Sequence, residues 1–444
     1  MLRVFRTLLF LIATISLLVT SLSCHRTPIE PEKIKANLIF EDALCTEAYL
    51  RLKLAYIDFP ANVDLYVDKN KVNSFRTFSE DTVIMVENLL PKKSYTSYVR
   101  IYPAGGGEIV SNEVSFTTMD TTSHNFTWQI DTLGDGGGSV LYDVAIINDT
   151  LVYAVGEIYK RDSLGNWDPL PYNLVKWNGQ RWQLLRIQFY TFCGQAGTGS
   201  YPAKSIFAFG PDDIWIGMNG SQVVRWNGQA QSLPECTPVS INKLWGENPN
   251  SIWAVGNNGQ IAHYDGVRWK RIESGTTLDV YDIYGSRNLR TGETEIYAVA
   301  AKQFVTFDRR ILRVRSSGVE AVSDSTIPYS LHGVWLKGGG PYYVVGSGIY
   351  RKRDPMRAGP WQWLHPGVTP YYTYAIRGND VNDVFICGSY GELLHFNGIQ
   401  FRSYQNTPGF SAIEFYEVSC LGNLVVTVGY IQSRAVVVIG RRAL

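Results

Sequence analysis

A short pattern recurs along the C-terminal part of this chain: an aromatic residue, Asn-Gly or Asp-Gly, two further residues, and a second aromatic residue. It reads KWNGQRW at residues 176–182 and HYDGVRW at residues 263–269. Asn-Gly and Asp-Gly are strong signals for a two-residue hairpin turn, because type I′ geometry needs positive φ at both central positions. Each copy of the pattern therefore predicts a β-hairpin.

The spacing of these turns indicates a repeat. They fall at Asn178-Gly179, Asn227-Gly228, Asp265-Gly266 and Asn397-Gly398, and 219 residues separate the first from the last. If the final gap of 132 residues holds three units, the five steps average about 44 residues, which is the length of a propeller blade.

Four short strand-like runs surround each turn in the same order. The clearest copies are 205–233, 241–272 and 374–404, and less regular copies cover 140–187, 279–322, 330–365 and 413–444. The last copy has only three such runs, and the missing fourth is the segment FTWQID at 126–131. We therefore predict an all-β fold in which residues 126–444 form a seven-bladed β-propeller closed by an N-terminal strand.

The second strand of the clearer copies is preceded by a polar turn and ends in glycine, as in DDIWIG, NSIWAVG and NDVFICG. In this it resembles a group of bacterial propellers that includes the BNR-like and photosystem-assembly-like propellers, which implies the architecture and no particular chemistry. The sialidase Asp-box has a residue between its Asp and Gly, whereas Asp265 and Gly266 are adjacent. Lipoproteins of similar layout are sometimes labelled glucosyltransferase, but this sequence contains no nucleotide-sugar site to support that activity.

A different composition precedes residue 120. All twelve tryptophans lie at or after Trp128, and residues 34–118 alternate apolar and polar side chains, which predicts a β-sandwich. The run from Leu89 to Tyr95, together with SNEVSFTT ending at Thr118, resembles a fibronectin type III domain, although the usual core tryptophan is missing. The resemblance implies a spacer or a binding module. Residues 119–125 are polar and are expected to form a linker.

The N-terminus has the features of an export signal. Arg3 and Arg6 precede an apolar run from Leu8 to Leu22, which is too short to span a bilayer. The segment Ser21-Leu22-Ser23-Cys24 resembles the lipobox of bacterial lipoproteins, which implies a signal peptide over 1–23, lipidation of Cys24 and a linker over 24–33. The alternative is an ordinary signal peptide with an incidental cysteine. The expected location is the cell envelope, at the outer membrane, on a side that the sequence leaves open.

Charge and motif content argue against several function classes. Forty-one basic and forty acidic side chains give a net charge of +1, so nucleic acid is not expected as a partner. No CxxC motif or His/Cys cluster predicts a metal, no cofactor is expected, and no catalytic constellation is apparent. His263 and His395 occupy equivalent positions in their repeats and are interpreted as structural. Asp212, Asp213 and Asp383 belong to turns on the face opposite the expected ligand.

The expected ligand face carries the loops between blades and the loops between second and third strands, where propellers commonly bind. The largest insertions, 159–173 and 190–204, map onto this face. Exposed aromatic residues suit sugar or protein recognition, although such residues can also simply pack a long loop. The candidate binding residues are Trp167, Tyr190, Phe192, Tyr201, Tyr371 and Tyr372.

Five cysteines follow Cys24. Cys193 and Cys236 fall on two successive interblade loops, and export permits a disulfide between them. Cys387 and Cys420 fall on strands, where buried free thiols are favoured, while the state of Cys45 is left open.

Three functions stay open on these grounds. The favoured one is a monomeric, membrane-anchored lipoprotein whose propeller binds a protein or a glycan. The first alternative is a carbohydrate-active enzyme, a glycosidase or lyase, with its site at the central channel, and the second is an envelope assembly factor. Carboxylates lining the channel a few ångströms apart would favour the enzyme, and an aromatic rim without them would favour binding.

Overall fold

The computed structural model describes residues 35–364 and 367–443. These residues form strands β1 to β38 and a single 3-10 turn, η1 (Ser389–Gly391), and they contain no α-helix. None of them belongs to a helix that could cross a membrane. The signal peptide predicted for 1–23, Cys24 and the linker 24–33 lie outside the described residues.

The described residues divide into two compact units. One unit runs to Ala43 and continues over Glu47–Thr118, and the other comprises Leu44–Thr46 and the chain from Met119 onward. The segment 119–125, expected as a linker, thus belongs to the second unit. It is held there by a hydrogen bond of 2.8 Å between Nδ1 of His124 and Nδ1 of His395.

The first unit is built from two antiparallel sheets. One contains β1 (Lys35–Ala43), β2 (Ala48–Ala55) and β5 (Asp81–Val86). The other contains β4 (Asn70–Thr77), β3 (Ala61–Val67), β6 (Ser94–Tyr102) and β7 (Ile109–Val110), with β8 (Val114–Thr117) also paired to β6. Alternate side chains such as Leu50 and Leu52 of β2 and Val63 and Leu65 of β3 enter one shared core. The alternation in the sequence reflects this burial of one face of each strand.

The second unit contains seven four-stranded antiparallel sheets among the described residues. In chain order, the first three are β10 (Val140–Asn148), β11 (Leu151–Ile158), β12 (Tyr172–Trp177), β13 (Trp182–Leu185); β16 (Ala203–Gly210), β17 (Asp213–Met218), β18 (Gln222–Trp226), β19 (Glu235–Cys236); and β20 (Lys243–Asn248), β21 (Ser251–Val255), β22 (Ile261–Tyr264), β23 (Trp269–Ile272). The next three are β24 (Asp279–Arg287), β25 (Thr294–Ala301), β26 (Arg309–Arg315), β27 (Gly318–Val322); β28 (Leu331–Leu336), β29 (Tyr342–Gly346), β30 (Gly348–Lys352), β31 (Gln362–Trp363); and β32 (Thr373–Asp380), β33 (Asp383–Gly388), β34 (Leu393–Phe396), β35 (Phe401–Ser403). A small hairpin, β14 (Phe189–Tyr190) and β15 (Thr198–Gly199), lies between the first two sheets in sequence.

The seventh sheet combines the two ends of this unit. Its strands are β36 (Ile413–Leu421), β37 (Leu424–Ile431), β38 (Arg434–Arg442) and β9 (Phe126–Leu133). The β9–β38 ladder runs from Ala435↔Leu133 to Arg442↔Phe126, so the sequence segment expected to complete the last sheet does so.

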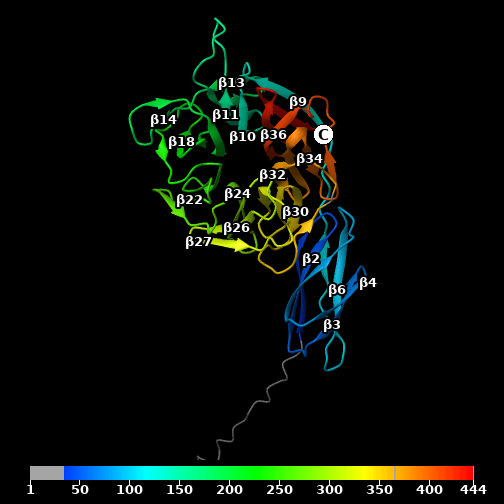
Figure 1. The fold of residues 1–444 in the computed structure, drawn as a ribbon. Coiled ribbons are helices and arrows are strands. Elements are labelled where there is room, and N and C mark those ends of the chain that lie inside the picture. The colour runs from blue at the N-terminus through cyan, green and yellow to red at the C-terminus, as the bar shows by residue number, and fades with distance from the viewer. Residues whose placement is uncertain (1–34, 365–366, 444) are drawn as a thin grey trace, which may run out of the picture. The chain divides into compact units, whose positions relative to one another are not determined.

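The sheets follow one another around a circle (Figure 1). The first strand of each sheet contacts the first strand of the next, from β10 through β16, β20, β24, β28 and β32 to β36, and β36 contacts β10. This is the arrangement of a β-propeller, with the first strands innermost.

Aromatic side chains of one inner strand pack against glycines of the next, and this allows the two strands to approach closely. Trp245 of β20 lies against Gly285 of β24, where an added Cβ would come within 2.5 Å of the indole. Trp335 of β28 covers Gly378 of β32 in the same way, at 2.8 Å. A methyl group at either glycine would displace a buried tryptophan and separate two sheets.

The hairpin turns differ from the type I′ geometry predicted for them. In KWNGQRW, the last paired residues are Trp177 and Trp182, so the loop has four residues, and Asn178 N–H donates to the Arg181 carbonyl. Only the glycine has positive φ, +90° at Gly179. The Asn178 side-chain oxygen accepts the N–H groups of Gln180 and Arg181, and Asp265 does the same for Val267 and Arg268. Asn or Asp therefore serves this turn through its side-chain oxygen and not through tolerance of positive φ.

Candidate ligand site at the channel mouth

All but one of the inner strands carry one extra residue close to their start. In six of the seven sheets the register of the first ladder skips one position, which marks a β-bulge, and in the third sheet Asn242 stands in the equivalent place, immediately before β20. A bulge removes a residue from the ladder and redirects its side chain. The seven residues, here called the mouth ring, are Tyr142, Lys204, Asn242, Tyr281, His332, Tyr374 and Tyr416.

The mouth ring lines a cavity of about 400 Å³. The inner strands also contribute Asp143, Lys243, Asp282 and Glu417 to its lining. The remaining lining residues, Gln303 and Phe304, come from the loop between β25 and β26. This loop joins second and third strands, so the cavity opens on the face where the sequence predicted ligand binding. We call it the mouth cavity.

Aromatic contacts run along most of the mouth ring. His332 stacks on Tyr281 with ring centroids 4.5 Å apart, and Tyr374 meets His332 edge-on at 5.1 Å. Tyr416 then lies 5.4 Å from Tyr374 and 6.0 Å from Tyr142. Five consecutive sheets, from the fourth around to the first, therefore present one continuous aromatic wall to the cavity.

The protonation state of His332 follows from its hydrogen bond. Its Nδ1 lies 2.8 Å from the carbonyl oxygen of Tyr374, and a carbonyl can only accept, so Nδ1 carries the proton. Burial lowers the pKa of His332 to about 4. At neutral pH the ring is therefore uncharged, and Nε2 is a hydrogen-bond acceptor.

Glu157 fixes the position of the tyrosine at the end of the aromatic wall. The hydroxyls of Tyr142 and Tyr159 donate to its two carboxylate oxygens at 2.8 and 2.7 Å. Lys204 lies over the ring of Tyr142, with Nζ 4.0 Å from the ring centroid.

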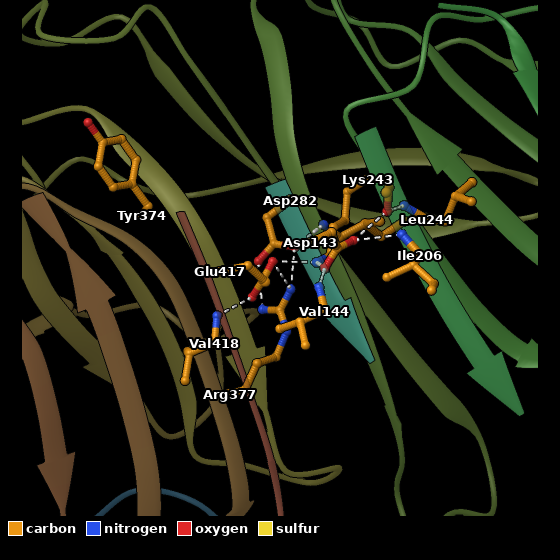
Figure 2. A network of polar contacts seen from close by, with 12 residues as sticks. Asp143, Val144, Ile206, Lys243, Leu244, Asp282, Tyr374, Arg377, Glu417 and Val418 are labelled. Atoms are coloured by element: carbon orange, nitrogen blue, oxygen red, sulfur yellow. Dashed lines mark hydrogen bonds and ion pairs between the residues drawn. The ribbon is translucent and has the colours of Figure 1, made fainter. Parts of the chain in front are cut away.

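A group of five charged residues lies on the same inner strands as the mouth ring, and Figure 2 shows it together with Tyr374. Lys243 Nζ donates to Asp143 Oδ1 at 2.8 Å and also bonds Glu417. Arg377 donates to both oxygens of Asp282 at 2.9 Å and lies 3.5 Å from Glu417. We call these residues, Asp143, Lys243, Asp282, Arg377 and Glu417, the channel network.

The carboxylates of the channel network also accept hydrogen bonds from neighbouring strands. Asp143 Oδ2 accepts from Ser205 Oγ at 2.7 Å and from the Ile206 N–H at 2.9 Å. Asp282 Oδ2 accepts from the Val334 N–H at 2.9 Å. The channel network and these donors together connect the inner strands of all seven sheets. The carboxylates of the network therefore hold the ring of sheets together.

Ionisation within the network is uneven. Burial opposes ionisation of Asp282, but Arg377 and Lys243 hold its pKa below the ordinary value. Burial raises the pKa of Glu417 despite the same two cations, with Asp143 and Asp282 adding to the effect. Glu417 is therefore the member of the network whose charge is least favoured.

The structure divides the six predicted binding residues into two groups. Tyr371 and Tyr372 line a second cavity of about 460 Å³, which shares Phe304 with the mouth cavity. Tyr372 contacts the Phe304 ring at 4.9 Å and the His332 ring at 6.2 Å. These two residues lie at the edge of the site.

The other four predicted residues lie on the insertions of the first two sheets. Trp167 is stacked under Arg161, whose guanidinium lies 4.0 Å from the ring centroid. Tyr190 is in β14, and the Tyr201 hydroxyl is 2.9 Å from Thr191 Oγ1. Phe192 is 67% exposed. None of the four lines the mouth cavity.

Cys193 and Cys236 form a disulfide, with Cα atoms 5.9 Å apart. Cys236 lies in the short outer strand β19, where the sequence placed an interblade loop, because Glu235 and Cys236 pair with Val223 and Gln222. Cys45, Cys387 and Cys420 are free thiols in the structure. Over residues 35–364 and 367–443, no three His, Cys, Asp or Glu side chains are grouped as a metal site.

Sequence reasoning missed the mouth ring and the channel network. A signal was available, because the triplets Tyr142-Asp143-Val144, Tyr281-Asp282-Ile283 and Tyr416-Glu417-Val418 repeat the order tyrosine, acid, β-branched residue. Each triplet stands at the start of an inner strand. Aligning the repeats at this position would have marked the site.

Comparison with known proteins supports the fold. No family model and no curated protein matches the sequence. A selenomethionine-substituted virginiamycin B lyase from Staphylococcus aureus aligns with a TM-score of 0.51 and 12% identity, over 72% of this chain and 100% of that chain. The catalytically inactive form of the lyase with quinupristin aligns with a TM-score of 0.50 and 12% identity, over 70% and 99%. YCF48 from Cyanidioschyzon merolae aligns with a TM-score of 0.49 and 12% identity, over 70% and 98%. The likeness to the lyase is one of fold.

Proposed function

We propose that this chain is a lipid-anchored, saccharide-binding protein whose ligand occupies the mouth cavity. The observation that carries the proposal is the mouth ring: seven sheets each contribute one residue to the lining of a cavity of about 400 Å³, six of them at a β-bulge, and five of these residues form a continuous aromatic wall. Aromatic faces pack against the C–H faces of sugar rings, while tyrosine hydroxyls, Asn242 and Gln303 supply hydrogen bonds to sugar hydroxyls.

A concave cavity of this kind fits a small ring-shaped ligand better than a protein surface. A protein partner would instead use the exposed aromatics of the insertions, such as Phe192, which is 67% exposed. The two ligand classes thus engage different residues, and variants can distinguish them.

An enzyme that cleaves carbohydrate is the second candidate. The observation in its favour is that Asp143, Asp282 and Glu417 converge at the channel through shared cations. A glycosidase needs one protonated acid and one available carboxylate beside the sugar. Here each carboxylate is already bound by Lys243 or Arg377, and two of the three also accept N–H groups from a neighbouring strand, which favours a structural role for them and binding as the function of the cavity.

The site experiment is a pair of matched substitutions in the mature protein. Tyr281→Ala removes the ring on which His332 stacks, and it should weaken binding to a panel of purified oligosaccharides by about tenfold or more. Phe192→Ala should leave saccharide binding unchanged. Calorimetric titration would contradict the proposal if the two variants behaved in the opposite way or if wild type bound no saccharide.

The remaining parts of the proposal concern the rest of the chain. The seven sheets would be the seven blades of one propeller, and the first unit a fibronectin type III-like spacer. The hydrogen bond of 2.8 Å from the Leu90 N–H to the Tyr95 hydroxyl supports the latter, since it lies in the segment that carries the resemblance. An envelope assembly factor stays a further alternative, and the propeller is taken to act as a monomer.

The proposed anchor is lipid on Cys24, which would place the protein in the bacterial cell envelope, at the outer membrane. In cells labelled with a fatty acid, wild type should incorporate label and partition into detergent, whereas Cys24→Ser should do neither. An unlabelled wild type would overturn the anchor without affecting the mouth cavity.

A further inference from the structure

The mouth cavity contains one cation that has no carboxylate partner. Lys243, which also lines the cavity, and Arg377 each contact two carboxylates. Lys204, in the cavity wall, contacts the Tyr142 ring and forms no ion pair with any residue in the described part of the chain. The two carboxylates that act on its charge are already bound, Asp143 by Lys243 and Glu157 by the hydroxyls of Tyr142 and Tyr159.

This lysine is held in an environment that disfavours its charge. Burial lowers the pKa of Lys204, and Asp143 and Glu157 offset that effect only in part. A buried ammonium group without an ion-pair partner is costly, and an anion that enters the cavity would relieve that cost.

We propose that Lys204 is the subsite for the acidic group of an anionic saccharide, so that the ligand of the mouth cavity is a sugar bearing a carboxylate or sulfate. This inference rests on the proposed saccharide function. The sugar ring would pack on the aromatic wall, and its anionic group would accept a hydrogen bond from Lys204 Nζ.

His332 provides the opposite end of the site. Lys204 belongs to the second sheet and His332 to the fifth, which is three steps away in a ring of seven and therefore across the mouth. Because Nδ1 donates to the Tyr374 carbonyl, Nε2 of the neutral ring can accept a sugar hydroxyl. A positively charged donor, Lys204, on one side and a neutral acceptor, His332 Nε2, on the other would bind an acidic sugar in a single orientation.

A competing role for Lys204 is purely structural. The channel network contains three carboxylates and two cations, so the charge of Lys204 also balances the third carboxylate. A purely structural lysine would affect stability without affecting which ligand binds. Discrimination between charged and uncharged forms of the same sugar therefore tests the proposal.

The experiment compares uronate oligosaccharides with their methyl esters, in which the sugar is the same and the charge is removed. Wild type should bind the uronate about tenfold more tightly than the ester, as expected for one charge-assisted hydrogen bond. In Lys204→Gln the two affinities should become equal, and in Lys204→Arg the preference should persist in part. Lys176→Gln is the matched control, since its Nζ lies 5.7 Å from the Tyr153 ring centroid, outside the cavity.

The outcomes separate this inference from the proposed function. If uronate and ester bind wild type equally, or if Lys204→Gln keeps the preference while its melting temperature falls, the anion subsite is wrong and saccharide binding stands. If no saccharide of either kind binds, the proposed function itself is wrong. Sulfated sugars that bind wild type and lose their advantage in Lys204→Gln would support the subsite and identify sulfate as its source of charge.

Discussion

Arg377 is the residue on which the channel network depends most. Its guanidinium binds both oxygens of Asp282 at 2.9 Å and approaches Glu417 at 3.5 Å, and all three side chains are nearly removed from solvent. Arg377→Met should lower the free energy of unfolding by about 3–5 kcal/mol, because it leaves Asp282 buried without its partner. Urea unfolding of the purified protein measures the change.

A surface ion pair supplies the control for that substitution. Lys337 and Asp380 lie 2.6 Å apart, with side chains 40% and 36% exposed. Lys337→Met should cost less than about 1 kcal/mol. Equal losses in Arg377→Met and Lys337→Met would show that the network contributes no more than an ordinary surface pair.

His332 should make stability depend on pH. Its pKa is about 4 in the folded protein and near 6.5 in the unfolded chain, so the unfolded state binds more protons between these values. Stability is therefore complete above pH 6.5 and declines as the pH falls toward 4, with a loss of about 2 kcal/mol from this residue at pH 5.

His332→Asn provides the measurement, because an asparagine amide can still donate to the Tyr374 carbonyl but does not titrate. Urea unfolding at pH 7 and pH 5 should show a smaller loss in the variant than in wild type. Identical losses in both proteins would assign the acid sensitivity to other groups.

At the residue scale, the sequence indicated some positions and could not indicate others. It named Tyr371 and Tyr372, which line the second cavity, and it proposed the disulfide between Cys193 and Cys236, which the structure contains. The sequence did not predict the mouth ring, because a bulge adds one residue to a strand and a period-two pattern does not reveal the insertion of a single residue.

Among the elements, the insertion β14–β15 is attached to the second sheet by the disulfide. Cys193 lies between β14 and β15, Cys236 lies in β19, and the two are 43 residues apart in sequence. Closing a loop of this length stabilises the folded protein by up to about 4 kcal/mol in the chain-entropy account. The bond also fixes a segment whose strands are only two residues long.

Reduction of this disulfide should therefore loosen the β14–β15 insertion before it unfolds the rest of the protein. Wild type treated with reductant, and the double variant Cys193→Ala with Cys236→Ala, should both melt at a lower temperature and become sensitive to protease between residues 191 and 198. Reductant should have no further effect on the double variant. Protection of this segment in the double variant would mean that the two hydrogen bonds between Tyr190 and Gln222 and the packing of Tyr201 on Gly199 hold the insertion without the disulfide.

Second and outermost strands differed in how far the sequence could predict them. Second strands such as β17 and β21 are almost completely buried, so their apolar runs predicted them as strands. Outer strands such as β19 and β31 are two residues long and largely exposed, and they leave no hydrophobic pattern. The hairpin turns were located correctly but given the wrong geometry, since asparagine there accepts two backbone hydrogen bonds in place of adopting positive φ.

Across the whole propeller unit, the repeat length was the most informative feature. A unit of about 44 residues cannot bury both faces of its own sheet, so neighbouring units must cover them, and the sequence-based expectation of a closed array follows from that requirement. The chemistry of the channel does not follow from it. Arg377 and Lys243 contact carboxylates that are distant in sequence, and only closure of the ring brings Glu417 within reach of both.

Closure itself can be tested by moving β9. Deleting 126–133 would expose one edge of β38 and remove Trp128 from its place against Gly440, where an added Cβ would come within 2.3 Å of the indole. Buried residues of β38 such as Val436 and Val438 would lose part of their cover. We expect the deletion to abolish cooperative unfolding and to promote aggregation through the free edge.

Restoring the strand at the other end of the chain should rescue the fold. In the β9–β38 ladder Phe126 stands opposite Arg442, so appending 126–133 after residue 443 through a short Asn-Gly turn would form an antiparallel hairpin with the same register. This transposed protein should unfold cooperatively with nearly the stability of wild type. Differential scanning calorimetry of the deletion, the transposed protein and wild type measures this. A deletion as stable as wild type would show that the ring does not need its fourth strand in the seventh sheet, and a transposed protein as unstable as the deletion would show that the entry of the chain through 119–125 is itself required.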